Sequence, residues 1–205
     1  MSEGAADRTL ILASGSPSRL ATLRAAGIEP VVVVSGVDES QVTEPEAGAL
    51  AARLATLKAE AVESRLGDAA GRFVLGCDSV LEVEGAAYGK PSEADVARER
   101  WRAMRGKRGL LHTGHHLIDR ETSRAITRSV ATVLHFAEPA DVEIDAYVAS
   151  GEPLQVAGAF TIEGRGGAFV RSIEGDPHNV MGLSLPVLRE MFAEFGVTWT
   201  DLWNR

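Results

Sequence analysis

The chain has 205 residues and a formal net charge of −8, with 45% hydrophobic and 24% charged residues. This size fits one globular domain, or one domain with a smaller lobe, and no stretch reaches the roughly 18 apolar residues that span a membrane. The acidic balance argues against a nucleic-acid binder, which needs a basic face to displace the counterions of phosphates.

Residues 1–8 are predicted to form a frayed tail without the apolar core of a secretory signal, and residues 9–205 a single domain. The one cysteine, Cys77, excludes an internal disulfide framework and fits a reducing compartment. These features together predict a cytoplasmic protein.

The stretch SGSPSR lies between an apolar run and a helical pattern near the N-terminus. Residues 10–13 predict a short buried strand. Ser16 is predicted to cap a helix, Pro17 fits its first position, and Gly27 fits its end. The free N–H groups and positive dipole at such a helix start suit an anion such as phosphate. A capped strand-to-helix turn without a ligand is an equal alternative.

The next elements are a strand and a long helix. The run VVVV at 31–34 predicts a buried strand, followed by the acidic pair Asp38-Glu39. Residues 46–66 carry Ala and Leu at helical spacing and predict an amphipathic helix, with Lys58 near the edge of its apolar face.

The rest of the chain predicts further strands and helices. The segment RFVLGCDSVLEVEG at 72–85 predicts two short strands around residues 76–78. Helices are predicted over about 93–105, 140–151 and 184–196, the last of them capped by Ser184. Hairpins are predicted over 110–136, with a polar turn near 119–123, and over 158–175. Early alternation of strands and helices, followed by hairpins, predicts a mixed α/β sheet.

Acidic residues follow two of the predicted strands, at the position where ligands sit in open α/β sheets. Asp78 follows the run FVLG, and Asp38-Glu39 follows the VVVV run. Together with Lys58, Lys90 and the SGSPSR loop, these acids predict a site for phosphate and a metal ion. In such a site the carboxylates hold Mg²⁺ or Mn²⁺, and one carboxylate activates a water molecule. Each acid alone is better explained as a turn former; only the combination favours chemistry.

The cationic residues are unevenly divided, since there are 18 arginines but only three lysines, Lys58, Lys90 and Lys107. An ammonium group is a compact charge that reaches between phosphate oxygens, whereas a guanidinium is a planar fork. Lysines in so arginine-rich a chain therefore hint at phosphate contacts.

Three other motifs give weaker signals. The run HTGHH at 112–116 puts at most two histidines on one face of a strand, so packing is favoured over a zinc site. Cys77 has no partner histidine implied by spacing, so a buried small residue is favoured over a nucleophile. The run GRGG at 164–167 matches no known phosphate loop, and a tight hairpin is favoured.

Taken in order, these pieces resemble the Maf (septum-formation-protein-like) family of nucleotide pyrophosphatases over about residues 9–197. The motifs that carry the resemblance are LASGSPSR at 12–19, VDE at 37–39, LKAEA at 57–61, GCDSV at 76–80, GKP at 89–91, HTG at 112–114, Y…SGEP at 147–153 and AGAFTIEGRGGAFV…IEGDPHNVMGL at 157–183. Their order and spacing carry the signal, since each piece alone is weak.

The resemblance implies an elongated, twisted mixed sheet flanked by helices, two lobes around a cleft, and often a homodimer. It implies hydrolysis of a nucleoside triphosphate between the α- and β-phosphates with Mg²⁺ or Mn²⁺. Asp78 matches the catalytic carboxylate, the base for the attacking water, and shares metal binding with Glu39. The matches to phosphate-contacting positions are Ser14, Ser16, Arg19, Lys58 and Lys90.

Three positions bear on the choice of base. Ser18 replaces a bulky residue of the family's usual SPRR or SPWR. Ser79 stands where a pyrimidine-preferring branch has Thr and a 7-methyl-GTP branch has Gln, and Glu163 stands where these branches have Gln and Glu. The combination of Ser18, Ser79 and Glu163 fits neither branch and leaves base specificity open.

The leading functional prediction is a house-cleaning pyrophosphatase that removes modified or non-standard nucleotides. The family's name suggests an alternative, a nucleotide-binding regulator of cell division and septum formation that acts by protein contact. The set of acids and lysines favours the enzyme, because a binding protein needs no base. We expect nucleoside triphosphates as partners, and neither nucleic acid nor a membrane.

Overall fold

The predicted mixed α/β sheet is confirmed by a computed structural model, which describes residues 8–67 and 71–204. The predicted tail at 1–8 lies outside the described residues apart from Arg8. The sheet has seven strands in the order β2-β1-β3-β5-β6-β7, with β4 paired to β3. Strand β1 runs parallel to β2 and β3, and the other pairs are antiparallel. The strands are β1 Leu10–Leu12, β2 Val31–Val32, β3 Phe73–Val83, β4 Ala86–Tyr88, β5 Arg108–Asp119, β6 Arg124–Phe136 and β7 Val170–Glu174.

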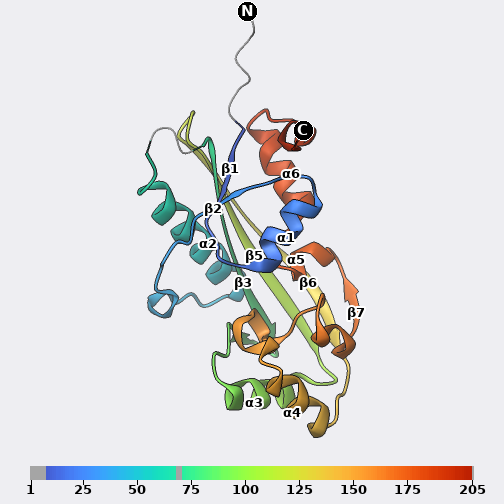
Figure 1. Cartoon of the computed structure of the whole chain (residues 1–205). Helices are drawn as coiled ribbons and strands as arrows, with labels where there is room; N and C mark the ends of the chain where they lie inside the picture. Colours follow the sequence, from blue (N-terminus) through green and yellow to red (C-terminus); the bar gives the residue numbers. More distant parts are fainter. Residues whose placement is uncertain (1–7, 68–70, 205) are drawn as a thin grey trace, which may run out of the picture.

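Helices lie on both faces of this sheet (Figure 1). Helix α2 covers one face, and α1 and α6 cover the other. Among the described residues, none of the helices combines the length and apolar composition needed to cross a membrane. The helices are α1 Pro17–Ala25, α2 Ala47–Glu63, α3 Ala94–Met104, α4 Asp141–Ala149, α5 Pro177–Val180 and α6 Leu185–Glu194.

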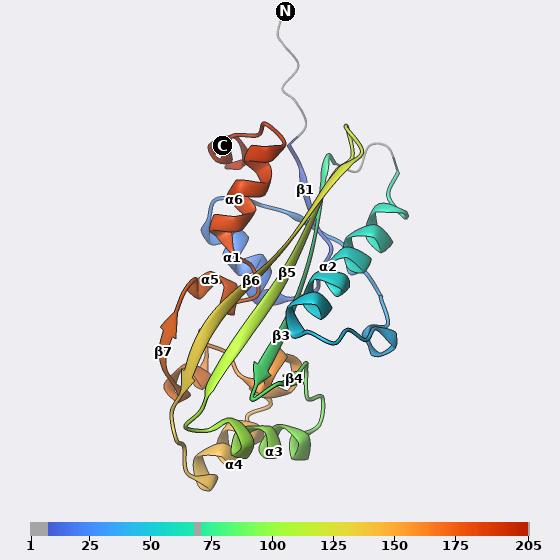
Figure 2. The same ribbon diagram turned by 180° about the vertical axis from the view of Figure 1, so that it is seen from behind.

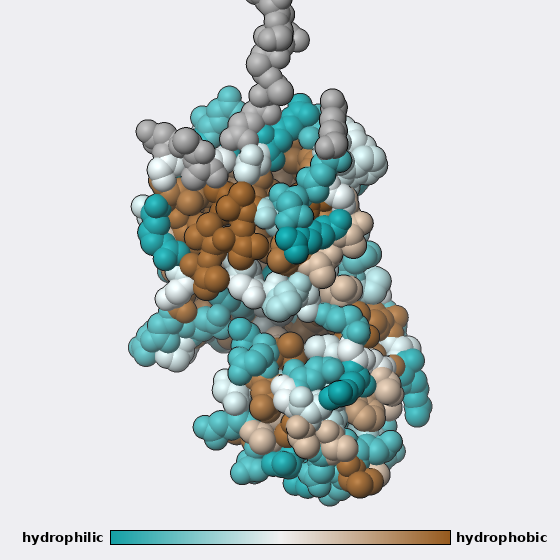
Figure 3. Space-filling model, viewed as in Figure 1, coloured by the Kyte–Doolittle hydropathy of each residue, from teal (hydrophilic) through white to brown (hydrophobic). Residues whose placement is uncertain are grey.

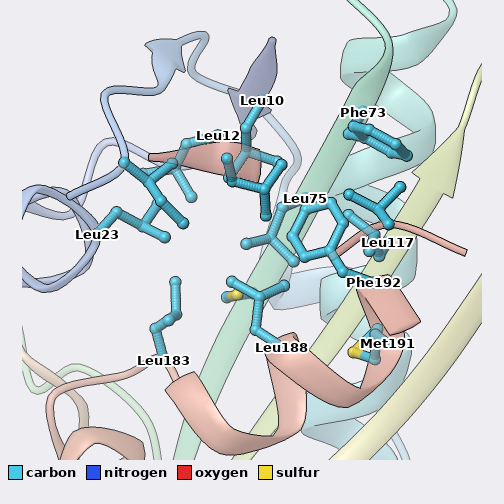
Figure 4. Close-up of a cluster of buried hydrophobic side chains, with 14 of the residues drawn as sticks. Leu10, Leu12, Leu23, Phe73, Leu75, Leu117, Leu183, Leu188, Met191 and Phe192 are labelled. Atoms are coloured by element: carbon cyan, nitrogen blue, oxygen red, sulfur yellow. The ribbon is translucent and has the colours of Figure 1, made fainter. Parts of the chain in front are cut away.

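Strands β3, β5 and β6 run most of the length of the molecule and carry a hydrophobic cluster at each end (Figure 2). The first cluster joins β1, α1 and α6 to the start of β3, with Phe73 against Phe192 at 5.1 Å between ring centroids (Figure 4). The second joins the end of β3 to α3 and α4 around the buried Trp101. The sheet thus links the two lobes that the resemblance implies.

The helix ends follow the local sequence signals. The Ser16 hydroxyl accepts a hydrogen bond from the Arg19 N–H at the start of α1, and Ser184 does the same for Val187 at the start of α6. The hairpin of β5 and β6 turns between Asp119 and Arg124, where a turn near 119–123 is predicted. These capping and turn predictions are confirmed.

The prediction of two short strands within 72–85 is wrong. Strand β3 runs unbroken through Gly76, Cys77 and Asp78, because β5 pairs with it at every residue from Phe73 to Glu82. Asp78 therefore lies in the middle of a strand and not at its end.

The prediction of a buried strand at 31–34 is also wrong. Only Val31–Val32 pair, at the edge of the sheet, and Val31 is 49% and Val34 60% exposed. Figure 3 shows apolar surface gathered over this edge. A β-branched run favours an extended chain but does not decide whether that chain is covered.

The hairpin predicted over 158–175 is a third error. This segment forms short 3₁₀ turns at Ala157–Ala159 and Arg165–Phe169, and only Val170–Glu174 is a strand, paired with β6. The GRGG run accordingly begins a 3₁₀ turn and not a tight hairpin.

Helix α2 crosses β3 and β5 at very short range. A Cβ atom at Gly76 would lie 2.8 Å from the Ala59 nitrogen, and one at Gly114 would lie 2.5 Å from the Ala52 nitrogen. Both atoms belong to the helix backbone, which cannot move aside cheaply. The crossing therefore requires glycine at both strand positions.

We predict that Gly114→Ala destabilises the fold by about 3 kcal/mol or more, because the added methyl overpacks the crossing. Gly67→Ala is the matched control, since no atom of the described residues lies within 4 Å of a Cβ atom there. Urea unfolding monitored by circular dichroism measures both changes. Equal midpoints for the two variants would contradict the tight crossing.

Two histidines of β5, His115 and His116, lie on opposite faces of the sheet. His116 faces α2, where its Nδ1 lies 3.3 Å from the Thr56 hydroxyl, whereas His115 points to the opposite face. The Ser184 N–H donates to His115 Nε2 at 2.9 Å. Burial lowers the pKa of His115 to about 4, so the ring is neutral in the folded protein.

We predict an acid-sensitive contribution from His115. Between pH 6.5 and 4 the His115 ring is protonated in the unfolded chain but stays neutral in the folded protein. Its contribution to the free energy of unfolding is therefore present above pH 6.5 and is lost as the pH falls to 4. The loss is about 3 kcal/mol for a shift from 6.5 to about 4. Unfolding free energies measured from pH 7.5 to 4 should fall more steeply for the wild type than for His115→Gln. Parallel curves would refute the assignment.

Candidate active site

A cavity of about 820 Å³ lies between the two hydrophobic clusters, on one edge of β3. A volume of this order is typical of small-molecule sites. In Figure 3 the surface is hollowed between the upper and lower parts of the molecule. The cavity brings together ten of the residues that the sequence predicts for the site: Ser14, Ser16, Ser18, Arg19, Glu39, Lys58, Asp78, Ser79, Lys90 and Glu163. The candidate Asp38 does not line it, because its carboxylate accepts the Ser40 N–H at 3.1 Å and caps a short 3₁₀ turn instead.

The cavity opens where β3 changes neighbours. Strand β1 pairs with β3 as far as Leu75, and β4 pairs with it from Leu81 onward. Asp78 and Ser79 lie in the interval between these partners. Because β3 pairs with β5 along its other edge, it presents a rigid platform to the cavity.

Lys58 joins the two candidate carboxylates. It projects from α2 and forms ion pairs with Asp78 and, at 2.6 Å between Nζ and Oε1, with Glu39. Lys58 and Asp78 are each only 6% exposed. Burial raises the pKa of Asp78 above its usual range, although Lys58 and Arg19 oppose this. Burial also acts to raise the pKa of Glu39, but the hydrogen bond and charge of Lys58 and the charges of Lys90 and Arg19 together outweigh it, and the pKa is lowered.

Arg19 is held on three sides at the start of α1. Its Nε donates to the Gly182 carbonyl at 2.8 Å, Nη1 to the Ser14 hydroxyl at 3.0 Å, and Nη2 to the Ser79 hydroxyl at 3.2 Å. Ser79 in turn lies 3.0 Å from the Thr113 hydroxyl. The guanidinium is therefore fixed beside the N-terminus of α1, where backbone N–H groups also point at the cavity.

The remaining predicted residues lie around the mouth of the cavity. Lys90 is exposed and follows β4. The Ser18 hydroxyl donates to the Glu163 carboxylate. This contact joins α1 to the segment just before the 3₁₀ turn Arg165–Phe169. Ser18 and Glu163 thus approach each other from opposite walls.

Sequence reasoning missed three residues that shape this site, Gly182, Thr113 and Glu152. Gly182 acts through its backbone carbonyl and Thr113 through Ser79. Glu152 lines the cavity itself. All three lie in motifs quoted for the resemblance, VMGL, HTG and SGEP, but their local patterns give no sign of these distant contacts.

The donor set fits a hard divalent cation. Glu39 and Asp78 offer carboxylate oxygens on one cavity, and Mg²⁺ typically binds one or two carboxylates together with substrate phosphate oxygens. Within the described residues, no group of three His, Cys, Asp or Glu side chains could hold an ion by itself. Substrate oxygens and water would therefore complete the coordination. Cys77 is fully buried, and burial raises its pKa to about 11, so the thiol is not a nucleophile here.

Comparisons with known proteins agree on one family. The family model described as "Maf-like protein" matches residues 9–195. Proteins named nucleoside triphosphate pyrophosphatase are similar over 96% of this chain: one of Streptomyces coelicolor is 52% identical over 95% of its own length, and one of Salinispora tropica is 54% identical over 88%. Among solved structures, the Ham1 protein of Staphylococcus aureus is 14% identical, with a TM-score of 0.42 over 64% of this chain and 73% of its own, too distant to carry an argument. The family model and these relatives both show that this chain belongs to the family of Maf-like proteins.

Proposed function

We propose that the protein is a nucleoside triphosphate pyrophosphatase, which hydrolyses a canonical or modified NTP or dNTP to the monophosphate and pyrophosphate. The observation that carries this proposal is the buried Asp78, set among Lys58, Glu39 and Arg19 in a nucleotide-sized cavity. The relatives' names support the same activity. They do not favour the alternative of a septum-formation regulator.

The proposed mechanism uses Asp78 as the base for the attacking water. A carboxylate with a raised pKa is a stronger proton acceptor than an exposed one. A Mg²⁺ or Mn²⁺ ion between Asp78 and Glu39 would supply charge neutralisation at the phosphate oxygens. Because Asp78 serves both roles in this proposal, its loss affects metal binding and proton transfer together.

The cationic side chains and the start of α1 are proposed to bind the triphosphate. Arg19, Lys58 and Lys90 would stabilise the charge that develops on the pyrophosphate leaving group. Ser14, Ser16 and the first N–H groups of α1 would hold phosphate oxygens. Arg19 needs little reorganisation for this, since three hydrogen bonds already fix its guanidinium.

The base would lie toward Ser18, Ser79 and Glu163, the three positions proposed to bear on specificity. Ser79 is partly committed to Arg19, so it couples the base side to the phosphate side. A cytoplasmic location, where nucleotide pools lie, and a homodimer remain proposals from the sequence and the resemblance.

Pyrophosphate release from a panel of NTPs and dNTPs, including 7-methyl-GTP, 5-methyl-UTP and pseudo-UTP, tests the activity in the presence of Mg²⁺ or Mn²⁺. We predict turnover of a subset with the monophosphate as co-product. Asp78→Asn should lower kcat by about 10²–10⁴, the usual contribution of a general base.

Asp119→Asn is the control for that variant. Asp119 is also buried and paired with an arginine, at 2.8 Å from Arg72, but it lies at the far end of β5. Its loss should lower stability and leave kcat near the wild-type value. Nucleotide binding without turnover of any substrate would refute the proposed enzyme.

A second prediction concerns Lys58, whose ammonium group competes with a cation for the two carboxylates. In Lys58→Met, Mn²⁺ should bind about tenfold more tightly at pH 8 without nucleotide, since a charge-assisted hydrogen bond contributes about 1.5–3 kcal/mol. Lys90→Met removes one charge from the same cavity, but Lys90 is exposed and is not the lysine that bridges the carboxylates. Calorimetry measures both affinities. Mn²⁺ binding to Lys58→Met no tighter than to Lys90→Met would contradict the competition.

A further inference from the structure

The Glu152 carboxylate gathers one loop of the cavity wall around itself. Its Oε1 accepts from the Thr161 hydroxyl at 2.7 Å and from the Gly166 N–H at 3.0 Å, and its Oε2 accepts from the Arg165 N–H at 3.0 Å. Burial acts to raise the pKa of Glu152, but these hydrogen bonds outweigh it and the pKa is lowered. The side chain is thus ionised at neutral pH and closes residues 161–166 into a loop.

The turn before Glu152 aims this carboxylate. Gly151 adopts a left-handed conformation with φ of 78°, which a side chain would strain. The Ser150 hydroxyl accepts from the Glu152 N–H at 3.3 Å, and Pro153 follows in the first turn of the 3₁₀ helix. The SGEP motif therefore orients the Glu152 side chain toward the 161–166 loop.

The glycines of GRGG make room for the same carboxylate. A Cβ atom at Gly164 would lie 2.6 Å from Glu152 Oε1, and one at Gly166 would lie 2.7 Å from the Thr161 carbonyl and closer still to the Tyr147 hydroxyl. SGEP and GRGG, apart in the sequence, thus form the two halves of one arrangement.

The loop is anchored on the second hydrophobic cluster. Phe169, at the end of the 3₁₀ turn, lies 5.5 Å from Trp101 and 5.5 Å from Tyr147 between ring centroids. Tyr147 is buried in α4, and burial and the nearby Glu152 charge raise its pKa, so its hydroxyl stays protonated. A rigid base therefore lies behind a loop whose backbone is held at its front by Glu152.

The outward end of this loop carries Glu163, which accepts the hydrogen bond from Ser18 across the cavity. Glu163 is exposed, and its position depends on the backbone of 161–166. Asp78 and Lys58 belong to β3 and α2 and have no share in this loop. Movement of the loop would therefore alter the Glu163 side of the cavity and leave the carboxylate–lysine group in place.

We propose that Glu152 is a positioning residue that fixes the 161–166 loop, and with it Glu163, at the base end of the bound nucleotide. This inference rests on the proposed function for the orientation of the nucleotide. Glu152 acts through backbone and hydroxyl groups of the loop and not on the reacting phosphorus. Its loss therefore weakens nucleotide binding without a matching loss of kcat.

The variant Glu152→Gln tests this proposal, because an amide nitrogen would face an N–H donor of the loop and one hydrogen bond would be lost. Calorimetry compares the nucleotide of highest wild-type affinity among ATP, GTP, CTP and UTP with inorganic tripolyphosphate, which lacks a base. We expect nucleotide affinity to fall about tenfold, the value of one hydrogen bond to a charged group, and tripolyphosphate affinity to change less than about twofold. In turnover assays, KM should rise with kcat nearly unchanged.

Glu143→Gln is the matched control. Glu143 also accepts a backbone hydrogen bond, from Ala140 at 2.7 Å, but at the start of α4 and outside the cavity. It should lower the melting temperature and leave both affinities unchanged. The double variant Glu152→Gln/Glu163→Gln should bind nucleotide no more weakly than the weaker single variant, since both changes disable one unit.

Several outcomes would overturn the proposal. One is an equal loss of nucleotide and tripolyphosphate affinity in Glu152→Gln. Another is a double variant whose loss of nucleotide affinity is the sum of the two single losses. A third is a Glu152→Gln protein with the same binding constants as Glu143→Gln. Because calorimetry needs no turnover, a base-dependent loss of binding in a protein without hydrolysis would refute the proposed function and retain the role of Glu152. Binding of none of the four nucleotides would overturn both.

Discussion

The close crossing of α2 over β3 and β5 is the constraint on which the site depends. With no room for a Cβ atom at Gly76 or Gly114, the helix backbone lies against the sheet. Lys58 is the neighbour of Ala59, which packs on Gly76, and Asp78 lies two residues beyond Gly76. The ion pair of Lys58 with Asp78 is therefore a direct consequence of packing. A larger residue at the crossing would separate the two charges as well as destabilise the fold.

The unbroken β3 gives this arrangement a second property. One strand supplies side chains to both hydrophobic clusters and carries Asp78 between them. Burying the carboxylate is costly unless it is paired. Lys58 and Arg19 provide that compensation from α2 and α1. The charge is thus compensated only when α1 and α2 have packed against β3, so the pair of Lys58 and Asp78 forms together with the fold.

Much of the fold could be predicted where the signal is local. The caps Ser16 and Ser184 and the period of α2 depend on neighbours in the sequence, and they are confirmed. The wrong predictions concern segments whose structure depends on contacts with distant parts of the chain. Pairing with β5 carries β3 through the Gly-Cys-Asp stretch, the sheet edge exposes the valines of β2, and Glu152 folds the loop that was predicted as a hairpin.

The site shows the same division. Most residues named from acids, lysines and the resemblance line one cavity, but Asp38 and Lys107 do not. The Gly182 carbonyl could not be predicted, since a backbone acceptor leaves no mark on residue type. Two of the three lysines line the cavity, whereas Lys107 pairs with Glu84 on the surface. Lysine usage in an arginine-rich chain was thus a fair but incomplete guide.

The two ends of the cavity differ in rigidity, and this difference bears on how specificity changes. Arg19 and Asp78 are buried and held by several partners, so substitutions beside them disturb charge pairing and packing together. Ser18 and Glu163 meet at the mouth through a single hydrogen bond. A substitution there costs little stability, since such surface changes usually stay within about 0.5 kcal/mol. Substitutions at Ser18 and Glu163, the proposed base end, therefore cost less stability than substitutions at the proposed phosphate end.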